Sequence, residues 1–241
     1  YNSYRNMIRL LGGNGYQFRN YHDYSGVKVV ILRHDIDTSL EYAVKLSEIE
    51  KEENVQAVYF ILLSTDFYNV ASKNSQRYLH EIRTNGGEIG LHFDEARYDI
   101  QSQEDIVKYI REELSILSEI CHEEIKVVSM HRPSELVLGK DIDLGEGIIN
   151  SYSNEFFQNF KYVSDSRRNW REDVEAIVTS GKYGKLHILT HPFWYREEEK
   201  SAREVLLEFI GDKGNSAYES LKENIRDLDE FVKREDVYMY K

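Results

Sequence analysis

Cysteine and proline are almost missing from this sequence. Cys121 is the only cysteine among 241 residues, so a disulfide within the chain and a zinc site built from several thiolates are both excluded. A lone cysteine fits a reducing compartment, and residues 1–11 are polar and mildly helical, unlike a basic and then apolar export signal. We therefore expect a cytoplasmic protein.

Positive charge and long hydrophobic runs are also scarce. Lys and Arg number 31 against 43 Asp and Glu, which gives a net charge of −12. Nucleic acids are bound through clustered cations, so this balance argues against a nucleic-acid partner. No apolar run approaches the ~18 to 20 residues that cross a bilayer, so we expect no membrane insertion. The oligomeric state is not indicated by the sequence.

The order of apolar segments predicts an α/β fold. No repeat and no linker rich in Gly, Pro or Ser marks a boundary, so we expect one domain over residues 1–241. Apolar or β-rich runs predict strands at 27–32, 55–63, 88–92, 126–130 and 186–190. Helical periodicity lies between them, with capping-box spacing at Thr38 and Glu41 and at Ser102 and Asp105. Two helices are expected to close the chain, the last with Ala217, Leu221, Ile225, Leu228 and Phe231 on one face. Such alternation implies a mostly parallel sheet, open or closed into a barrel.

Polar side chains end four of these strands, where parallel α/β folds collect their reactive groups. The strand ends read His34-Asp35-Ile36-Asp37, His92-Phe93-Asp94-Glu95, His131-Arg132-Pro133 and His191-Pro192. Imidazoles with a carboxylate suit zinc or another divalent transition ion that keeps a position open for water. Asp35 and Asp37 alternate along an extended segment, so both can face one cavity, where one can bind metal while the other takes a proton. The plainer alternative is that such strand-end residues only cap helices.

In order from His34 to His191, these segments resemble the polysaccharide deacetylase family, the NodB-like esterases of carbohydrate esterase family 4. The five matching segments are His34 to Asp37, Gly87 to His92, Arg132-Pro133, Asp165 to Trp170 and Leu189 to His191. The resemblance is that of a divergent member. It implies a distorted (β/α) barrel of about seven parallel strands and a metal-dependent hydrolase that removes an acyl group from an amide.

The resemblance also implies roles for particular residues. Asp35 is then the general base, Asp37 and His92 bind the metal, and His191 is the general acid. A divalent ion would activate water and polarise the acyl oxygen; zinc is expected, with cobalt and nickel as alternatives. Two further catalytic residues complete the scheme: Arg132 would keep Asp35 ionised through an ion pair, and Asp165 would orient His191.

The sequence departs from the family pattern at the metal site. The family's second metal histidine normally follows the first by four residues, and that position is Ala96 here. Arg132 directly precedes Pro133, and Ser134 stands where an aromatic residue is usual. His131, at the end of the adjacent strand, is the substitute ligand that we expect. Asp94 or Glu95 is the alternative, and loss of metal binding is the third possibility.

The sequence indicates the substrate less directly than it indicates the metal site. The family resemblance implies an N-acylated sugar or glycan precursor, either a small molecule or an oligosaccharide. Trp194, Tyr195 and Trp170 could line a sugar subsite or could simply be packing residues. A silent carbohydrate-binding barrel without metal, an Asp-x-Asp glycosyltransferase and a non-sugar amidase remain as alternatives. The glycosyltransferase reading leaves His92, His131 and His191 unexplained.

Overall fold

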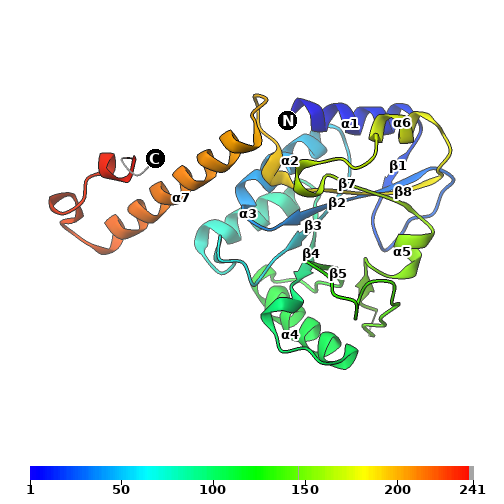
Figure 1. Ribbon diagram of the computed structural model, residues 1–241, viewed down its shortest axis with the longest axis horizontal. Coiled ribbons are helices and arrows are strands. Elements are labelled where there is room, and N and C mark those ends of the chain that lie inside the picture. Colours follow the sequence, from blue (N-terminus) through cyan, green and yellow to red (C-terminus); the bar gives the residue numbers. More distant parts are fainter. Residues whose placement is uncertain (146, 239–241) are drawn as a thin grey trace. The chain divides into compact units, whose positions relative to one another are not determined.

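The computed structural model describes residues 1–145 and 147–238, and the chain divides into two compact units (Figure 1). The first unit is Tyr1–Tyr195 and the second begins at Arg196. The single domain expected over residues 1–241 stays a prediction.

The first unit is built on one sheet in which every strand pair is parallel. Seven strands follow the order β6-β5-β4-β3-β2-β8-β7, and β1 pairs with β2 beside this path. Their bounds are β1 Gln17–Arg19, β2 Val29–Ile36, β3 Val58–Ile61, β4 Glu88–Phe93, β5 Val127–Met130, β6 Ile149–Asn150, β7 Lys161–Ser164 and β8 Lys185–Thr190. Among the described residues, β6 and β7 are not paired with each other, so the sheet is a curled half-barrel. The predicted α/β fold with about seven parallel strands is confirmed.

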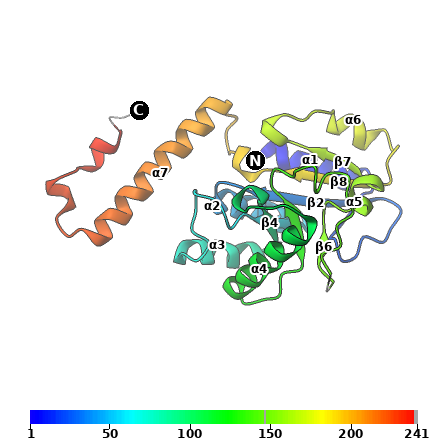
Figure 2. The same ribbon diagram turned by 60° about the horizontal axis from the view of Figure 1, so that its bottom comes forward.

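Helices cover the outer face of this sheet, and Figures 1 and 2 show α2, α3 and α4 together along one side of it. The helices of this unit are α1 Asn2–Gly13, α2 Leu40–Glu52, α3 Lys73–Thr84, α4 Gln103–Cys121, α5 Asn154–Gln158 and α6 Val174–Thr179. The capping box predicted at Ser102 and Asp105 is present at the start of α4. The one predicted at Thr38 is not: α2 starts one residue later, with Ser39 at its N-cap and no side-chain capping bond.

Strand β2 has two different faces, because successive side chains alternate across a strand. Val30, Leu32 and Ile36 pack outward in the main core beneath the helices. Val29 and Ile31 point inward to a smaller core with Phe60 and other residues. Pairing with β3 and β8 extends β2 to Ile36, beyond the expected end at Leu32, so Arg33, His34 and Asp35 belong to the strand itself. The inner face therefore passes from apolar to charged residues toward its carboxyl end.

The second unit contains one long helix and two short 3₁₀ segments. Helix α7 spans Ala202–Asn224 and is followed by η4 (Leu228–Glu230) and η5 (Arg234–Tyr238). The expected second closing helix is wrong, because α7 continues through Gly211 and Gly214 and ends where Ile225 turns extended at φ −116°. Only Ala217 and Leu221 of the predicted stripe lie on this helix. Nowhere in the described part of the chain is a helix both long and apolar enough to cross a membrane.

Candidate metal centre and active site

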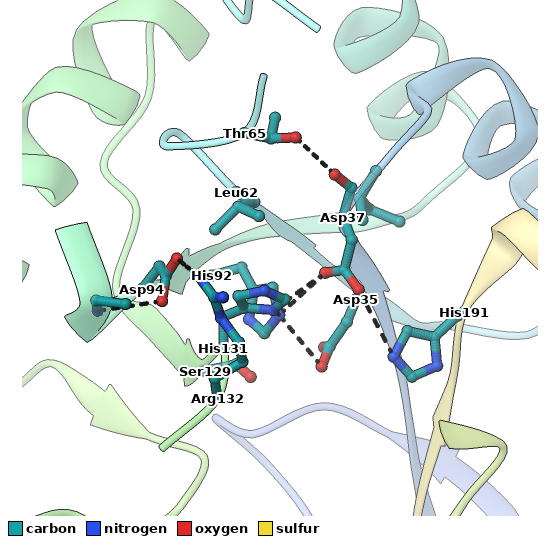
Figure 3. A network of polar contacts seen from close by, with 12 residues as sticks. Asp35, Asp37, Leu62, Thr65, His92, Asp94, Ser129, His131, Arg132 and His191 are labelled. Carbon is teal, nitrogen blue, oxygen red and sulfur yellow. Dashed lines mark hydrogen bonds and ion pairs between the residues drawn. The ribbon is translucent and has the colours of Figure 1, made fainter. Parts of the chain in front are cut away.

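Five polar side chains meet at the carboxyl ends of the central strands (Figure 3). They are Asp35, Asp37, His92, His131 and His191, and all five line one pocket of about 480 Å³. Side chains two residues apart point to the same face of a strand. Asp35 therefore shares the inward face of Arg33, and His131 shares the inward face of Ser129. Strand alternation and parallel pairing are therefore what bring these residues together.

Three of the side chains could hold a metal ion. Within the described residues, the one group with suitable donors close together is Asp37, His92 and His131. The Nε2 atom of His92 lies 3.3 Å from Asp37 Oδ1 and 3.2 Å from His131 Nδ1, and His131 Nδ1 lies 3.5 Å from Asp37 Oδ1. Tetrahedral zinc with bonds of ~2.0 to 2.1 Å separates its ligand atoms by about 3.3 Å. The donor set and its spacing therefore fit a divalent transition ion, with the ligands expected from the sequence.

The surroundings of this triad keep its carboxylate charged. Burial alone would raise the pKa of Asp37, but the hydrogen bond and charge of His92, with His191 and His131, hold that pKa far below its usual value. Burial and the neighbouring His92 lower the pKa of His131, which favours the neutral imidazole that a metal requires. The Asp37 backbone is fixed by Thr65, whose hydroxyl donates to the Asp37 carbonyl at 2.7 Å (Figure 3).

Asp35 has a different cationic partner from the one expected. Arg33, fully buried and two residues earlier on the same face of β2, donates from Nη2 to Asp35 Oδ2 at 2.8 Å. Although burial alone would raise the pKa of Asp35, the Arg33 charge and the nearby His92 and His191 hold it below the ordinary value. The predicted pairing of Arg132 with Asp35 is wrong, because the Arg132 guanidinium is 63% exposed and bonds to Asp94.

Arg33 is held from several sides inside the half-barrel. Its Nη2 donates to Ser129 Oγ at 2.6 Å and its Nη1 to Ser151 Oγ at 3.1 Å. The guanidinium carbon also lies 5.1 Å from the centre of the Phe60 ring and 5.3 Å from that of Tyr152. A buried charge needs such partners, since desolvation is costly. Arg33 therefore fixes where Asp35 points.

Asp94 and Glu95, the alternative metal ligands, are engaged elsewhere. Asp94 binds Arg132 and also accepts from the Ala96 amide. Glu95 accepts from the Ser134 amide at 2.9 Å and from the Ser134 hydroxyl at 2.5 Å. These bonds clamp the turn after β5, in which Arg132 has a positive φ of 50°. Asp94 and Glu95 therefore position the chain just after His131, which favours His131 as the third metal ligand.

His191 and Asp165 form the pair that was expected. Nδ1 of His191 lies 2.6 Å from Asp165 Oδ1, and the His191 amide donates to the same carboxylate at 3.1 Å. Burial would lower the pKa of His191, but the hydrogen bond to Asp165 and the charges of Asp165, Asp35 and Asp37 raise it to about 9. The free Nε2 lies 4.0 Å from Asp37 Oδ2 and faces the pocket. The imidazole is thus oriented and able to carry a proton.

The aromatic residues expected in the substrate site lie outside this pocket. Trp170 packs against the main core, Trp194 forms an edge contact with Phe193, and Tyr195 contacts Tyr4 and donates to Asp165. None of the three is among the lining residues. The pocket wall is formed instead by Tyr152 and Tyr162, from the irregular region after Pro133 where the sequence gives little periodicity.

A second polar group, the outer cluster, lies behind β2 on its helix-facing side. We define it as Tyr4, His34, Glu50, Tyr59 and Thr190. His34 Nε2 lies 2.6 Å from Glu50 Oε1, and His34 Nδ1 lies 2.6 Å from Thr190 Oγ1. Glu50 also accepts from the hydroxyls of Tyr4 and Tyr59. His34 is fully buried and its Nδ1 and Nε2 both have partners, so it takes no part in the pocket.

Sequence reasoning did not assign Ser129, Ser151, Tyr152 or Tyr162 to the site, and it did not pair Arg33 with Asp35. Arg33 carried a usable signal, since a charged residue inside an apolar strand and two positions before Asp35 must share the face of that aspartate. Ser129 carried the same kind of signal, because it lies two positions before His131. Ser151, Tyr152 and Tyr162 carried none, because their segments become neighbours of the site only in the folded sheet.

Three solved structures of low sequence identity are similar to this chain. A family 4 carbohydrate esterase from Bacillus anthracis is 18% identical, with 87% of this chain and 85% of that chain covered and a TM-score of 0.45. The chitin deacetylase of the fungal pathogen Colletotrichum lindemuthianum is 14% identical, with 83% and 87% covered and a TM-score of 0.46. A CE4 family pseudoenzyme from Bacillus anthracis is 15% identical, with 84% and 65% covered and a TM-score of 0.44.

Neither a protein-family model nor a curated protein matches the sequence. The solved structures that resemble the chain are described as members of the family that its motifs resemble.

Proposed function

We propose that this protein is a metal-dependent hydrolase that removes an acetyl group from the amide of an N-acylated sugar or glycan precursor. The observation that carries the proposal is the convergence of Asp37, His92 and His131 donors, at 3.2 to 3.5 Å, beside Asp35 and His191 in one pocket. Zinc is the proposed ion, with cobalt or nickel as alternatives.

The chemistry follows from the position of each side chain. A divalent ion bound by Asp37, His92 and His131 would supply Lewis acidity toward water and the acyl oxygen. Asp35, kept ionised by Arg33, takes the proton of the attacking water. His191, held by Asp165, protonates the departing amine. The two proton-transfer groups lie on neighbouring strands, at the carboxyl end of β2 and just after β8.

The proposed substrate is a soluble sugar and not a secreted polymer. A pocket of about 480 Å³ is within the range for a small ligand, and Tyr152 and Tyr162 offer flat surfaces for a sugar ring. The lone, buried Cys121 fits the reducing, cytoplasmic setting that we expect for such a substrate.

A silent carbohydrate-binding barrel is the second candidate, favoured by Ala96 at the usual position of a metal histidine. Elemental analysis of protein never exposed to chelator decides between the two. We expect about one divalent ion per chain, and acetate release from an N-acetylhexosamine that stops when the ion is removed and returns when zinc is added.

The ligand set is tested by substitution. His131→Ala should lose most of the bound metal, whereas His80→Ala, which changes an exposed histidine of α3, should retain it. Asp94→Asn should also retain it, because Asp94 binds Arg132. Loss of metal in Asp94→Asn but not in His131→Ala would overturn the ligand assignment. Wild-type protein that fails to take up zinc, cobalt or nickel would favour the silent barrel.

A further inference from the structure

Almost every charged side chain that lines the pocket has a partner in the described structure. Asp35 pairs with Arg33, Arg132 with Asp94, and His191 with Asp165. Asp37 faces the imidazoles of the metal triad. Glu172 accepts from Lys161 Nζ at 2.6 and 2.7 Å. Within the protein, these pairs leave little charge to attract or repel a ligand.

Arg171 is the exception. It lines the pocket and is exposed, and among the described residues its guanidinium makes no hydrogen bond and no ion pair. Its neighbour Glu172 is paired with Lys161. Two hydroxyl residues, Ser164 at the end of β7 and Ser166 just after it, also line the pocket. The pocket lining therefore includes one exposed cation with free donors.

We propose that Arg171 binds an anionic group, a carboxylate or a phosphate, on the N-acylated sugar that this pocket hydrolyses. The inference rests on the proposed function and names its substrate class. A guanidinium binds such groups through two parallel hydrogen bonds, a geometry that lysine cannot reproduce. The chain as a whole carries a net charge of −12, so it does not attract anions from a distance, and recognition depends on this local cation.

The kinetic test compares three sugars that differ in charge: N-acetylglucosamine, its 6-phosphate and N-acetylmuramic acid. For the wild-type protein, kcat/KM should be about 10-fold or more higher for one of the anionic sugars than for the neutral one. Arg171→Gln should remove this preference mainly by raising KM, and Arg171→Lys should restore part of it. The rate with the neutral sugar should fall less than the rate with the preferred anionic sugar in both variants. Phosphate and carboxylate are distinguished by which anionic sugar is preferred.

Arg77→Gln is the matched control, because it removes one exposed arginine of α3 that does not line the pocket. It should leave the preference intact, which separates a local contact from a change in overall charge. Equal kcat/KM for neutral and anionic sugars, or a preference that survives Arg171→Gln, would overturn the inference while leaving hydrolysis, and so the proposed function, in place.

A binding measurement keeps the two proposals apart. Titration calorimetry of the wild-type and Arg171→Gln proteins with the same three sugars does not depend on turnover. If no sugar is hydrolysed but the anionic ones bind more tightly to the wild type, the proposed hydrolase activity fails and the Arg171 site stands. If the anionic sugars bind no more tightly than the neutral one, the Arg171 inference fails.

Discussion

The two faces of β2 carry buried polar clusters that look alike in composition and differ in bonding. The outer cluster joins His34 to Glu50, and Glu50 accepts from three side chains. The inner cluster, Asp35, Asp37, His92 and His131, also joins imidazoles to carboxylates. Here Asp35 Oδ1 and His92 Nδ1 are buried without a hydrogen-bond partner in the described structure.

That difference is the one expected between a ligand-binding cluster and a structural one. Buried polar groups are normally hydrogen-bonded, and leaving them unsatisfied costs about 1–3 kcal/mol each. The outer cluster meets the rule and so serves stability. The inner cluster violates it beside an open pocket, where a metal ion, water or substrate can supply the missing partners. Burial and residue type alone would not separate the two.

Substitution of Arg33 should have the largest effect on stability. Replacing it with methionine removes one partner of a buried ion pair and leaves Asp35 uncompensated, which should lower the free energy of unfolding by about 3–5 kcal/mol. Urea unfolding measures this loss. Arg5→Met, which breaks surface pairs with Glu52 and Glu53, should have a much smaller effect. The double variant Arg33→Met/Asp35→Asn should be more stable than Arg33→Met alone, and a double variant that is less stable would contradict the pairing.

Asp35 tests the inner cluster for chemistry. Asp35→Asn should lower kcat by about 100-fold or more while the metal content stays unchanged, because a positioned base is lost and the three ligands remain. His191→Ala should behave in the same way. Release of metal from Asp35→Asn would mean that the two aspartates have exchanged roles, and full activity in both variants would discard the acid and base assignments.

Glu50 tests the outer cluster for stability. Glu50→Gln removes the charged acceptor of Tyr4, Tyr59 and His34, and the free energy of unfolding should fall by about 2–3 kcal/mol. Glu48→Gln, on the exposed side of the same helix, is the control and should change stability less. The folded fraction should keep its kcat. A Glu50→Gln variant that is as stable as the wild type but inactive would reverse the distinction between the clusters.

His187 provides the smallest and most selective test. It is fully buried on β8, 2.6 Å from the Tyr21 hydroxyl and without a carboxylate partner, and burial with the nearby Arg33 lowers its pKa to about 3. The unfolded chain takes up this proton below pH ~6.5 and the folded chain does not, so stability is present above pH ~6.5 and declines as the pH falls toward 3.

Between pH 7 and pH 5 this single histidine should contribute a loss of about 2 kcal/mol. His187→Phe should remove that part of the pH dependence, as measured by urea unfolding of both proteins at the two pH values. An unchanged pH dependence in His187→Phe would show that this imidazole binds a proton as readily in the folded protein as in the unfolded chain.

Much of this organisation could be predicted from the sequence. Apolar runs and helical spacing indicate the parallel α/β fold, and the strand-end residues indicate the inner cluster, because parallel strands place their carboxyl ends at one edge. Asp37, His92 and His131 came together as expected, as did His191 and Asp165. These predictions depend on local periodicity and on one general property of parallel sheets.

The remaining features depend on contacts that no local pattern contains. Arg132 was expected beside Asp35, but the positive φ at that residue turns its side chain to Asp94. Trp170, Trp194 and Tyr195 have the composition of a sugar site. Trp170 and Tyr195 nevertheless pack against the main core, and Trp194 contacts Phe193. Which way a loop residue points is set by neighbours that are distant in sequence.

The register between β2 and β8 has a consequence for folding. His34 is paired with Thr190, so the segments that carry Asp35 and His191 are aligned by a ladder between residues far apart along the chain. Such long-range pairing forms slowly, because the chain loses the entropy of a large loop before the stabilising contacts form. Until β8 arrives, this side of β2 exposes unpaired backbone groups that can join another chain. We therefore expect refolding yield to fall with protein concentration, and C-terminally shortened chains lacking β8 to aggregate.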